Sequence, residues 1–222
     1  MARPFYTQEQ VEEGRARLAA AALKLYREHG YSAVTLKQVG AEVGVSSATP
    51  YRFFESKEAL FERVRADVYR SFGEHLQRCD PKRGDAFLRL RRIARGIFEF
   101  GLNHPQDYRL IFSMRQPAVA PGELLFQERQ RTIDHVLPIC EEVIASRRMR
   151  GNALAQLHLA WAAIHGLISF HLTGNLVHGC ELEDLIEPML DRVFTPAGAT
   201  PTVQGAARAA RRQPSPTRSS RR

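Results

Sequence analysis

A short stretch in the first quarter of the chain combines small side chains with two long polar ones. The small side chains carry hydroxyl or methyl groups, and the long ones carry a phenol and a guanidinium: Ser46, Ser47, Ala48, Thr49, Tyr51 and Arg52. Small polar groups fit against base edges in the floor of a DNA groove, whereas a phenol or a guanidinium reaches phosphate oxygens. The chemistry that these residue types indicate is recognition of a nucleic acid.

Two short helices joined by a tight turn would position these side chains. Thr35 is a suitable N-cap, and Leu36, Val39 and Val43 recur at spacings of three and four. Gly44 follows where a helix would end in a left-handed residue. We therefore predict a first helix that begins after Thr35 and ends before Gly44.

The second helix is predicted to begin at Ser47, which would act as its N-cap. Pro50 then becomes the third helical residue, where the missing amide has no helical partner to lose. Lys57 stands at the start of the next helix, where free backbone amides favour an anion. Two capped helices around a glycine turn form the pattern of a helix-turn-helix.

This run resembles the TetR family of transcriptional regulators, whose typical sequence is T-x-x-x-I-A-x-x-A-G-V-S-x-G-T-L-Y-x-H-F-x-S-K. The matching positions are Thr35, Val39, Gly44, Val45, Ser46, Thr49, Tyr51, Phe54, Ser56 and Lys57. The chain departs from the pattern at Gly40, Val43, Ala48, Pro50 and Phe53. The resemblance implies a DNA-reading head and leaves the base preference open. The alternative is an ordinary helical hairpin in a core, which has no need of so many polar groups on one side.

The polar residues of this head divide into two expected roles. Tyr51, Thr35 and Lys57 are predicted to contact phosphates, because each lies at a helix edge. Lys37 is predicted to face base edges, as the related family position commonly does, together with Ser47, Ala48 and Thr49. Arg52 and Ser46 complete the predicted DNA-binding set, and Arg52 suits either role.

Composition and charge fit a globular protein with a basic end. The chain has 222 residues, is 44% hydrophobic and carries a net charge of +8. Six arginines and no acid lie beyond Ala197, so the end of the chain accounts for six of the eight net positive charges. These arginines are either a composition bias or a source of non-specific attraction to phosphates.

Three widely spaced cysteines, without a CxxC pair, argue against a disulfide framework and suit a reducing cytosol. The N-terminal residues lack the apolar run of a signal peptide. The longest apolar stretch, residues 157–173, is interrupted by three histidines and a glycine, so we expect no membrane span. The expected location is the cytoplasm.

Apolar residues recur at helical spacing along the rest of the chain, which predicts an all-α fold. Thr7, Ser56 and Asn152 are the expected N-caps of three long helices, and residues 116–121 are expected to form a loop. We predict an N-terminal three-helix helix-turn-helix head at residues 1–57. A larger helical body for effector binding and dimerisation follows at residues 58–195, and residues 196–222 are expected to be a disordered basic tail.

The segment W-A-A-I-H-G resembles the WHG type of TetR-family C-terminal domain. In that family the last two helices form the dimer seam and the body encloses an apolar pocket. The resemblance therefore implies a dimer interface at Gly166, Phe170, Leu185 and Met189. It also implies a ligand pocket lined by Phe98, Leu102, Phe112, Phe126, Trp161 and His165, although such side chains serve equally as ordinary core packing.

The sequence offers little support for a metal site or for catalysis. His158, His165, His171 and His178 are six or seven residues apart, or roughly 10 Å along a helix, too far for one metal ion. The chain has no G-x-S-x-G sequence and no phosphate-binding loop. We expect no catalytic residue, no metal and no cofactor.

The resemblance implies a homodimeric regulator that a small apolar molecule releases from a palindromic operator, acting as a repressor. Two alternatives remain open. One is an enzyme or carrier on a helical bundle with a vestigial head, which would bind no promoter DNA. The other is a nucleic-acid coat protein, which would bind independently of sequence.

Overall fold

The computed structural model describes residues 7–114, 123–177 and 179–194, and within these ranges every regular element is helical. The long helices are α1 (Gln8–His29), α3 (Lys57–Cys79), α4 (Ala86–Asn103), α6 (Leu124–Ala145), α7 (Ala153–Leu172) and α8 (Leu182–Val193). The short elements are α2 (Leu36–Glu42), α5 (Pro105–Tyr108), the 3-10 helices η1 (Tyr31–Ala33) and η2 (Pro50–Arg52), and the π-helical turn η3 (Arg109–Ser113). The prediction of an all-α fold is confirmed.

Side-chain caps define where the helices begin. Thr7 forms a complete capping box with Gln10 at the start of α1. Thr35, Ser56 and Asn152 each accept a hydrogen bond from the backbone amide three residues on, as the sequence predicts. The expected loop at residues 116–121 and the expected tail at residues 196–222 lie outside the described residues.

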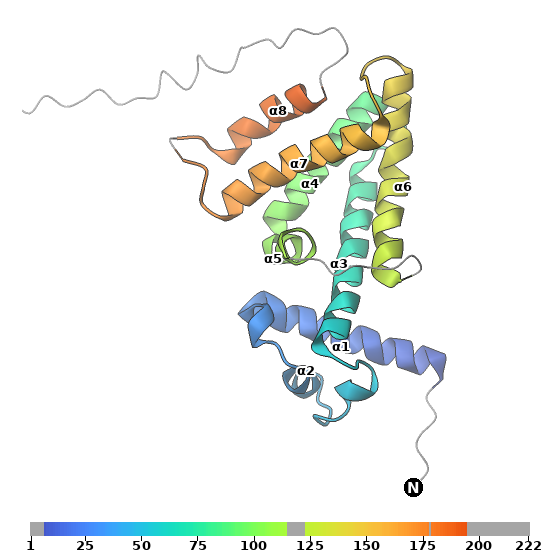
Figure 1. Ribbon diagram of the computed structural model, residues 1–222, viewed down its shortest axis with the longest axis vertical. Coiled ribbons are helices and arrows are strands. Elements are labelled where there is room, and N and C mark those ends of the chain that lie inside the picture. The colour runs from blue at the N-terminus through green and yellow to red at the C-terminus, as the bar shows by residue number, and fades with distance from the viewer. Residues whose placement is uncertain (1–6, 115–122, 178, 195–222) are drawn as a thin grey trace, which may run out of the picture. The chain divides into compact units, whose positions relative to one another are not determined.

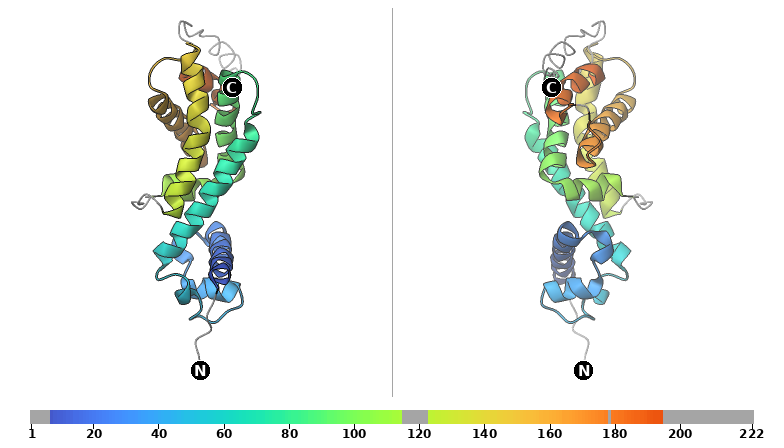
Figure 2. Two further views of the ribbon diagram at one scale, coloured as in Figure 1. Left: turned by 90° about the vertical axis from the view of Figure 1, so that its right-hand side faces the viewer. Right: turned by 90° about the vertical axis from the view of Figure 1, so that its left-hand side faces the viewer.

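The chain divides into two compact units, one ending at Cys140 and the other beginning at Glu141. In the first unit α1, α2 and η2 gather around the N-terminal end of α3, and α4 returns alongside α3 (Figure 1, Figure 2). In the second unit α7 packs against α8. The predicted boundary between residues 57 and 58 falls at the start of α3, inside the first unit, and remains a proposal.

Aromatic rings fill the core of the first unit. Phe72 on α3 meets Phe100 on α4 and Phe112 in η3 edge to face, with ring centroids 5.1 and 5.2 Å apart. Phe112 also stands 5.4 Å from Tyr69 in an edge-to-face arrangement. Because Phe61, near the start of the same α3, contacts Tyr26 of α1, one continuous helix joins the head to the rest of the unit.

Candidate nucleic-acid interface

The turn between α2 and the following segment is a complete Schellman motif. Gly44 has φ +73°, and its amide donates to the Ala41 carbonyl at 3.0 Å. The amide of Val45 donates to the Gly40 carbonyl at 2.9 Å. These two bonds satisfy the last carbonyls of α2 and reverse the chain, as the sequence pattern predicts.

The second helix of the predicted motif is shorter than the sequence suggests. We expected a helix from Ser47, whereas the chain turns through Ser47 and Ala48 and forms only the 3-10 turn η2. Pro50 has no amide to donate to the Ser46 carbonyl, and that carbonyl accepts the Thr49 amide at 3.0 Å instead.

Most of the predicted DNA-binding side chains lie on the exposed surface of this turn. Thr49 and Lys57 are half-buried, and Tyr51 is 59% exposed. The other exposed members of the set are Thr35, Lys37, Ser46, Ser47, Ala48 and Arg52. The structure therefore brings the predicted set together on α2, the turn, η2 and the first residue of α3.

Four of these residues also make hydrogen bonds inside the head. The Thr35 hydroxyl donates to Gln38 Oε1 at 2.7 Å, and the hydroxyls of Ser46 and Thr49 lie 2.9 Å apart. Lys57 Nζ donates to the Tyr31 carbonyl at 2.5 Å and lies 4.1 Å from the centroid of the Tyr31 ring. A phosphate contact by Lys57 must therefore use its remaining N–H donors.

Two departures from the family pattern pack against glycines. A Cβ on Gly40 would stand 3.0 Å from Pro50 Cγ and 3.3 Å from the Ser46 carbonyl oxygen. A Cβ on Gly14 of α1 would stand 2.5 Å from the Phe53 ring. Pro50 and Phe53 therefore fit because Gly40 and Gly14 leave room for their rings.

Polar contacts from α1 fix the position of the turn. Arg17 donates to the Val43 carbonyl at 2.6 Å, close to the end of α2. Lys24 pairs with Glu42 at 2.6 Å, and that hydrogen bond is the main cause that raises the pKa of Lys24. These two contacts from α1 hold the C-terminal end of α2, and with it the start of the turn, in place.

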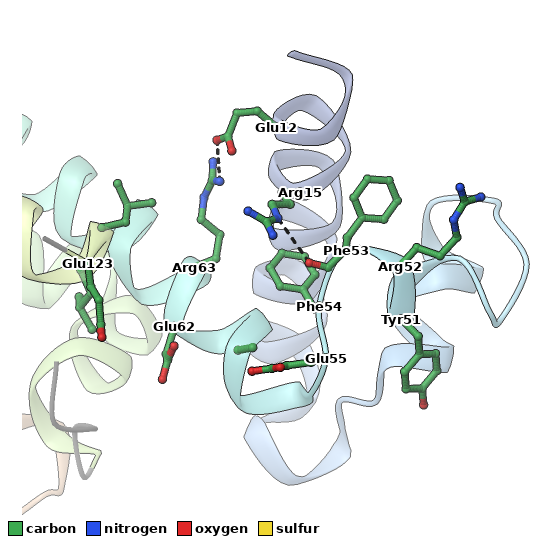
Figure 3. A pocket seen from close by; sticks show the side chains of 13 residues that line it. Glu12, Arg15, Tyr51, Arg52, Phe53, Phe54, Glu55, Glu62, Arg63 and Glu123 are labelled. Atoms are coloured by element: carbon green, nitrogen blue, oxygen red, sulfur yellow. Dashed lines mark hydrogen bonds and ion pairs between the residues drawn. The ribbon is translucent and has the colours of Figure 1, made fainter. Parts of the chain in front are cut away.

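A cleft of about 760 Å³ lies behind η2, and no local sequence pattern predicts it. Arg63 reaches Glu12 of α1 at 2.6 Å, and Arg15 donates to the Phe53 carbonyl at 3.3 Å (Figure 3). The lining of the cleft also includes Glu55, Glu62 and Glu123. These carboxylates make the cleft a poor phosphate site, although Tyr51 and Arg52 stand at its edge.

The predicted pocket residues divide between the two units. Phe98, Leu102, Phe112 and Phe126 belong to the first unit, where Phe98 is buried and the other three are half-buried. Trp161 and His165 lie half-buried on α7 of the second unit. Burial lowers the pKa of His165, which favours a neutral imidazole at pH 7. The pocket remains a prediction.

The predicted dimer residues lie on α7 and α8. Phe170 is 55% exposed, and Leu185 and Met189 are half-buried. In the described part of the chain, apart from the neighbouring residues and the nearby backbone of α7, no atom comes within 4 Å of a Cβ built on Gly166. The close helix approach predicted at Gly166 is therefore not seen within the described residues, and a dimer contact there stays a prediction.

Helix α7 is longer and more apolar than the expectation of no membrane span assumed, although that expectation stays a prediction. By length and composition it is apolar enough to cross a membrane, because its histidines and glycine carry no fixed charge. Only 17% of its most apolar window is buried. The helix therefore leaves an apolar surface uncovered in the described protomer.

Comparisons with known proteins agree with this geometry. Residues 18–64 match the family described as "Bacterial regulatory proteins, tetR family". Residues 90–193 match the family described as "Tetracyclin repressor-like, C-terminal domain". Together the two matches cover the helix-turn-helix and most of the remaining helices, whereas the WHG type stays a prediction.

Individual relatives are distant. The chain is 27% identical over 131 residues to the nucleoid occlusion factor SlmA of Vibrio cholerae, covering 59% of this chain and 62% of that protein. It is 32% identical over 103 residues to the uncharacterised HTH-type regulator YvkB of Bacillus subtilis, covering 46% and 52%. The matched segment thus spans about half to three fifths of these relatives' length.

Among solved structures, the regulator FadR from Bacillus subtilis in complex with stearoyl-CoA superposes with a TM-score of 0.64 at 15% identity. That match covers 81% of this chain and 97% of the other. It shows the fold alone. The helix-turn-helix geometry and the two family matches establish that the chain belongs to the TetR family of DNA-binding transcriptional regulators, whose fold is not that of an enzyme.

Proposed function

We propose that this protein is a homodimeric, cytoplasmic repressor that leaves a palindromic operator when a small apolar molecule binds its body. The observation that carries the proposal is the Schellman turn after α2. It holds an exposed row of small polar side chains on a rigid corner of the head. Sequence recognition needs such a row to be placed against base edges in a fixed register.

The roles of the head residues follow from reach and exposure. Lys37 lies exposed on the first turn of α2, so it is assigned to base edges together with Ser47 and Ala48. Tyr51 carries an exposed phenol on η2 and is assigned to a phosphate. Because η2 is a single turn, α2 carries a larger share of base reading than a full-length second helix would leave to it.

Dimerisation is assigned to α7 and α8. An apolar helix whose surface is mostly uncovered in one protomer favours association with a second copy. Two heads would then meet two half-sites about one helical turn apart, which makes the operator an inverted repeat. Gly166, Phe170, Leu185 and Met189 are proposed to lie in this seam.

The proposed effector is a small molecule with an apolar body. The related FadR fold holds stearoyl-CoA, a ligand with a long acyl chain. Here the four proposed lining residues of the first unit, Phe98, Leu102, Phe112 and Phe126, are all aromatic or aliphatic, as a ligand with an apolar body would require. Binding would release DNA by favouring a spacing of the two heads that fits the operator poorly.

Footprinting on the promoter beside the protein's own gene tests the proposal. We expect a protected inverted repeat whose occupancy falls when the effector is added. Binding to that promoter no tighter than to random DNA would favour the coat-protein alternative. The absence of any DNA binding would favour the enzyme or carrier on a helical bundle.

A further inference from the structure

Three side chains that commonly bind metals meet where the C-terminal part of α3 passes α4. His75 and Cys79 stand four residues apart on α3, so they share one face of that helix. Glu99 approaches them from α4. Their ligand atoms all lie within 4.8 Å of one another. The proposed DNA contacts and the predicted effector pocket use none of these residues.

The distances suit a small tetrahedral ion. Cys79 Sγ lies 3.6 Å from His75 Nε2 and 3.9 Å from Glu99 Oε2, and His75 Nε2 lies 3.8 Å from Glu99 Oε2. Around a tetrahedral zinc, with bonds of about 2.0–2.3 Å, such atoms stand roughly 3.3–3.6 Å apart. The three atoms would need to close in by only a few tenths of an ångström.

The packing beside Cys79 leaves space for its sulfur. A Cβ on Gly96 of α4 would stand 2.6 Å from Cys79 Sγ, so the thiol occupies room that only glycine leaves there. The His75 ring lies 5.9 Å from the Phe100 ring, which restricts its tilt. Glu99 is 59% exposed, so its carboxylate can swing toward an ion arriving from solvent.

We propose that His75, Cys79 and Glu99 form a binding site for a zinc-like divalent cation, with water as the fourth ligand. Thiolate and imidazole ligands favour zinc over magnesium or calcium, which prefer oxygen. Three protein ligands with one solvent position form an open site. The ion would link α3 to α4 within the first unit.

Binding requires two proton movements. Burial, more than the nearby Glu99, raises the pKa of the Cys79 thiol, so the metal must displace the thiol proton to solvent. His75 Nε2 also lies 3.0 Å from the Gly96 carbonyl and can donate to it. Coordination through Nε2 moves the imidazole proton to Nδ1 and breaks that bond. The raised thiol pKa also argues against Cys79 as a nucleophile, which would need a stabilised thiolate.

Cobalt titration of the full-length, tag-free protein tests the site, after a chelator has removed any metal. We expect one equivalent of Co²⁺ to give thiolate-to-cobalt charge-transfer absorption, and Zn²⁺ to abolish it. Cys79→Ser should remove the absorption, whereas the matched control Cys180→Ser should keep it, because Cys180 lies exposed elsewhere. No absorption in the unmodified protein, or absorption that survives in Cys79→Ser, overturns the proposal.

Thiol labelling of the unmodified protein gives an answer even if Cys79→Ser fails to fold. One equivalent of Zn²⁺ should slow the reaction of Cys79 and leave the reaction of Cys180 unchanged. Glu99→Gln should weaken this protection, raising the zinc concentration needed by roughly tenfold or more. Equal Cys79 labelling rates with and without zinc would overturn the site, whatever the outcome of the DNA-binding experiments.

Discussion

Asp80 is the buried carboxylate around which several side chains of the first unit gather. Arg89 donates to both of its oxygens, at 2.9 and 3.0 Å, and the Lys82 amide adds a third bond at 2.9 Å. The hydrogen bond from Arg89 is the main cause that lowers the pKa of Asp80 from 3.8 to about 2. A lowered carboxyl pKa stabilises the fold above pH 3.8, and that stabilisation is lost as the pH falls through 2.

Asp80→Asn should therefore lower the free energy of unfolding by about 2 kcal/mol at pH 7 and by roughly half as much at pH 3. The loss is smaller at pH 3 because part of the stabilisation from the ionised carboxyl is already lost there, and a protonated carboxyl binds Arg89 about as weakly as an amide does. Urea unfolding of both proteins at the two pH values measures the difference. The exposed Glu183→Gln serves as the control and should change little at either pH. An equal loss for Asp80→Asn at pH 7 and pH 3 would contradict the assignment.

Lys37 and Tyr51 separate base reading from phosphate binding at the residue scale. Lys37→Ala should weaken operator binding by about 1–3 kcal/mol and relax the preference at one symmetric pair of positions. Tyr51→Phe should weaken all sequences about equally, because a phosphate contact carries no sequence information. Fluorescence anisotropy on the operator and on single-base variants measures both effects. An unchanged sequence preference in Lys37→Ala would show that Lys37 contacts the DNA backbone and not the base edges.

At the scale of elements, local hydrogen bonding made much of the fold predictable. Thr7, Thr35 and Ser56 bond to amides three residues away, and the Gly44 turn closes within six residues. Such contacts join residues that are close together in the sequence, so a local sequence pattern predicts them. The prediction of a full helix from Ser47 was wrong. Pro50 has no amide to donate to the Ser46 carbonyl, so that carbonyl accepts the Thr49 amide and only the short turn η2 forms.

Long-range contacts explain what the sequence did not predict. The cleft behind η2 joins Glu12, Phe53 and Glu123, which no local pattern relates. The cluster of His75, Cys79 and Glu99 depends on how α3 and α4 pack, although His75 and Cys79 alone have helical ligand spacing. The exposure of α7 could not be predicted, because an apolar composition suits a buried helix equally well.

The contact between Gly40 and Pro50 predicts a non-additive pair of substitutions. Gly40→Ala alone should destabilise by about 1 kcal/mol, because the rigid proline ring and the Ser46 carbonyl both crowd a new methyl group. With Pro50→Ala already present, only the Ser46 carbonyl still crowds the methyl group and helix propensity favours alanine, so the same change should cost clearly less than it does beside Pro50. Thermal or urea unfolding of the four proteins completes the cycle. Additive effects would show that the two residues do not restrict each other.

At the scale of the whole molecule, the uncovered surface of α7 predicts the assembly. Phe170→Glu should weaken the dimer by roughly tenfold or more, since it places a charge in an apolar seam. The matched control is Leu88→Glu on α4, because Leu88 is 59% exposed and Phe170 is 55% exposed. Sedimentation velocity over a range of concentrations measures the dimer fraction. Monomers in Leu88→Glu, or an intact dimer in Phe170→Glu, would place the seam elsewhere.

Selection of binding sites from a random DNA library by the full-length protein tests the central claim, sequence-specific binding by a dimer, most directly. The selected sequences should converge on an inverted repeat whose half-sites are centred about 34 Å apart or a multiple of that spacing. Sedimentation of the selected DNA with protein should show an even number of protomers per site. A selection that never converges, with equal affinity for every sequence and a steep dependence on salt, would contradict the account.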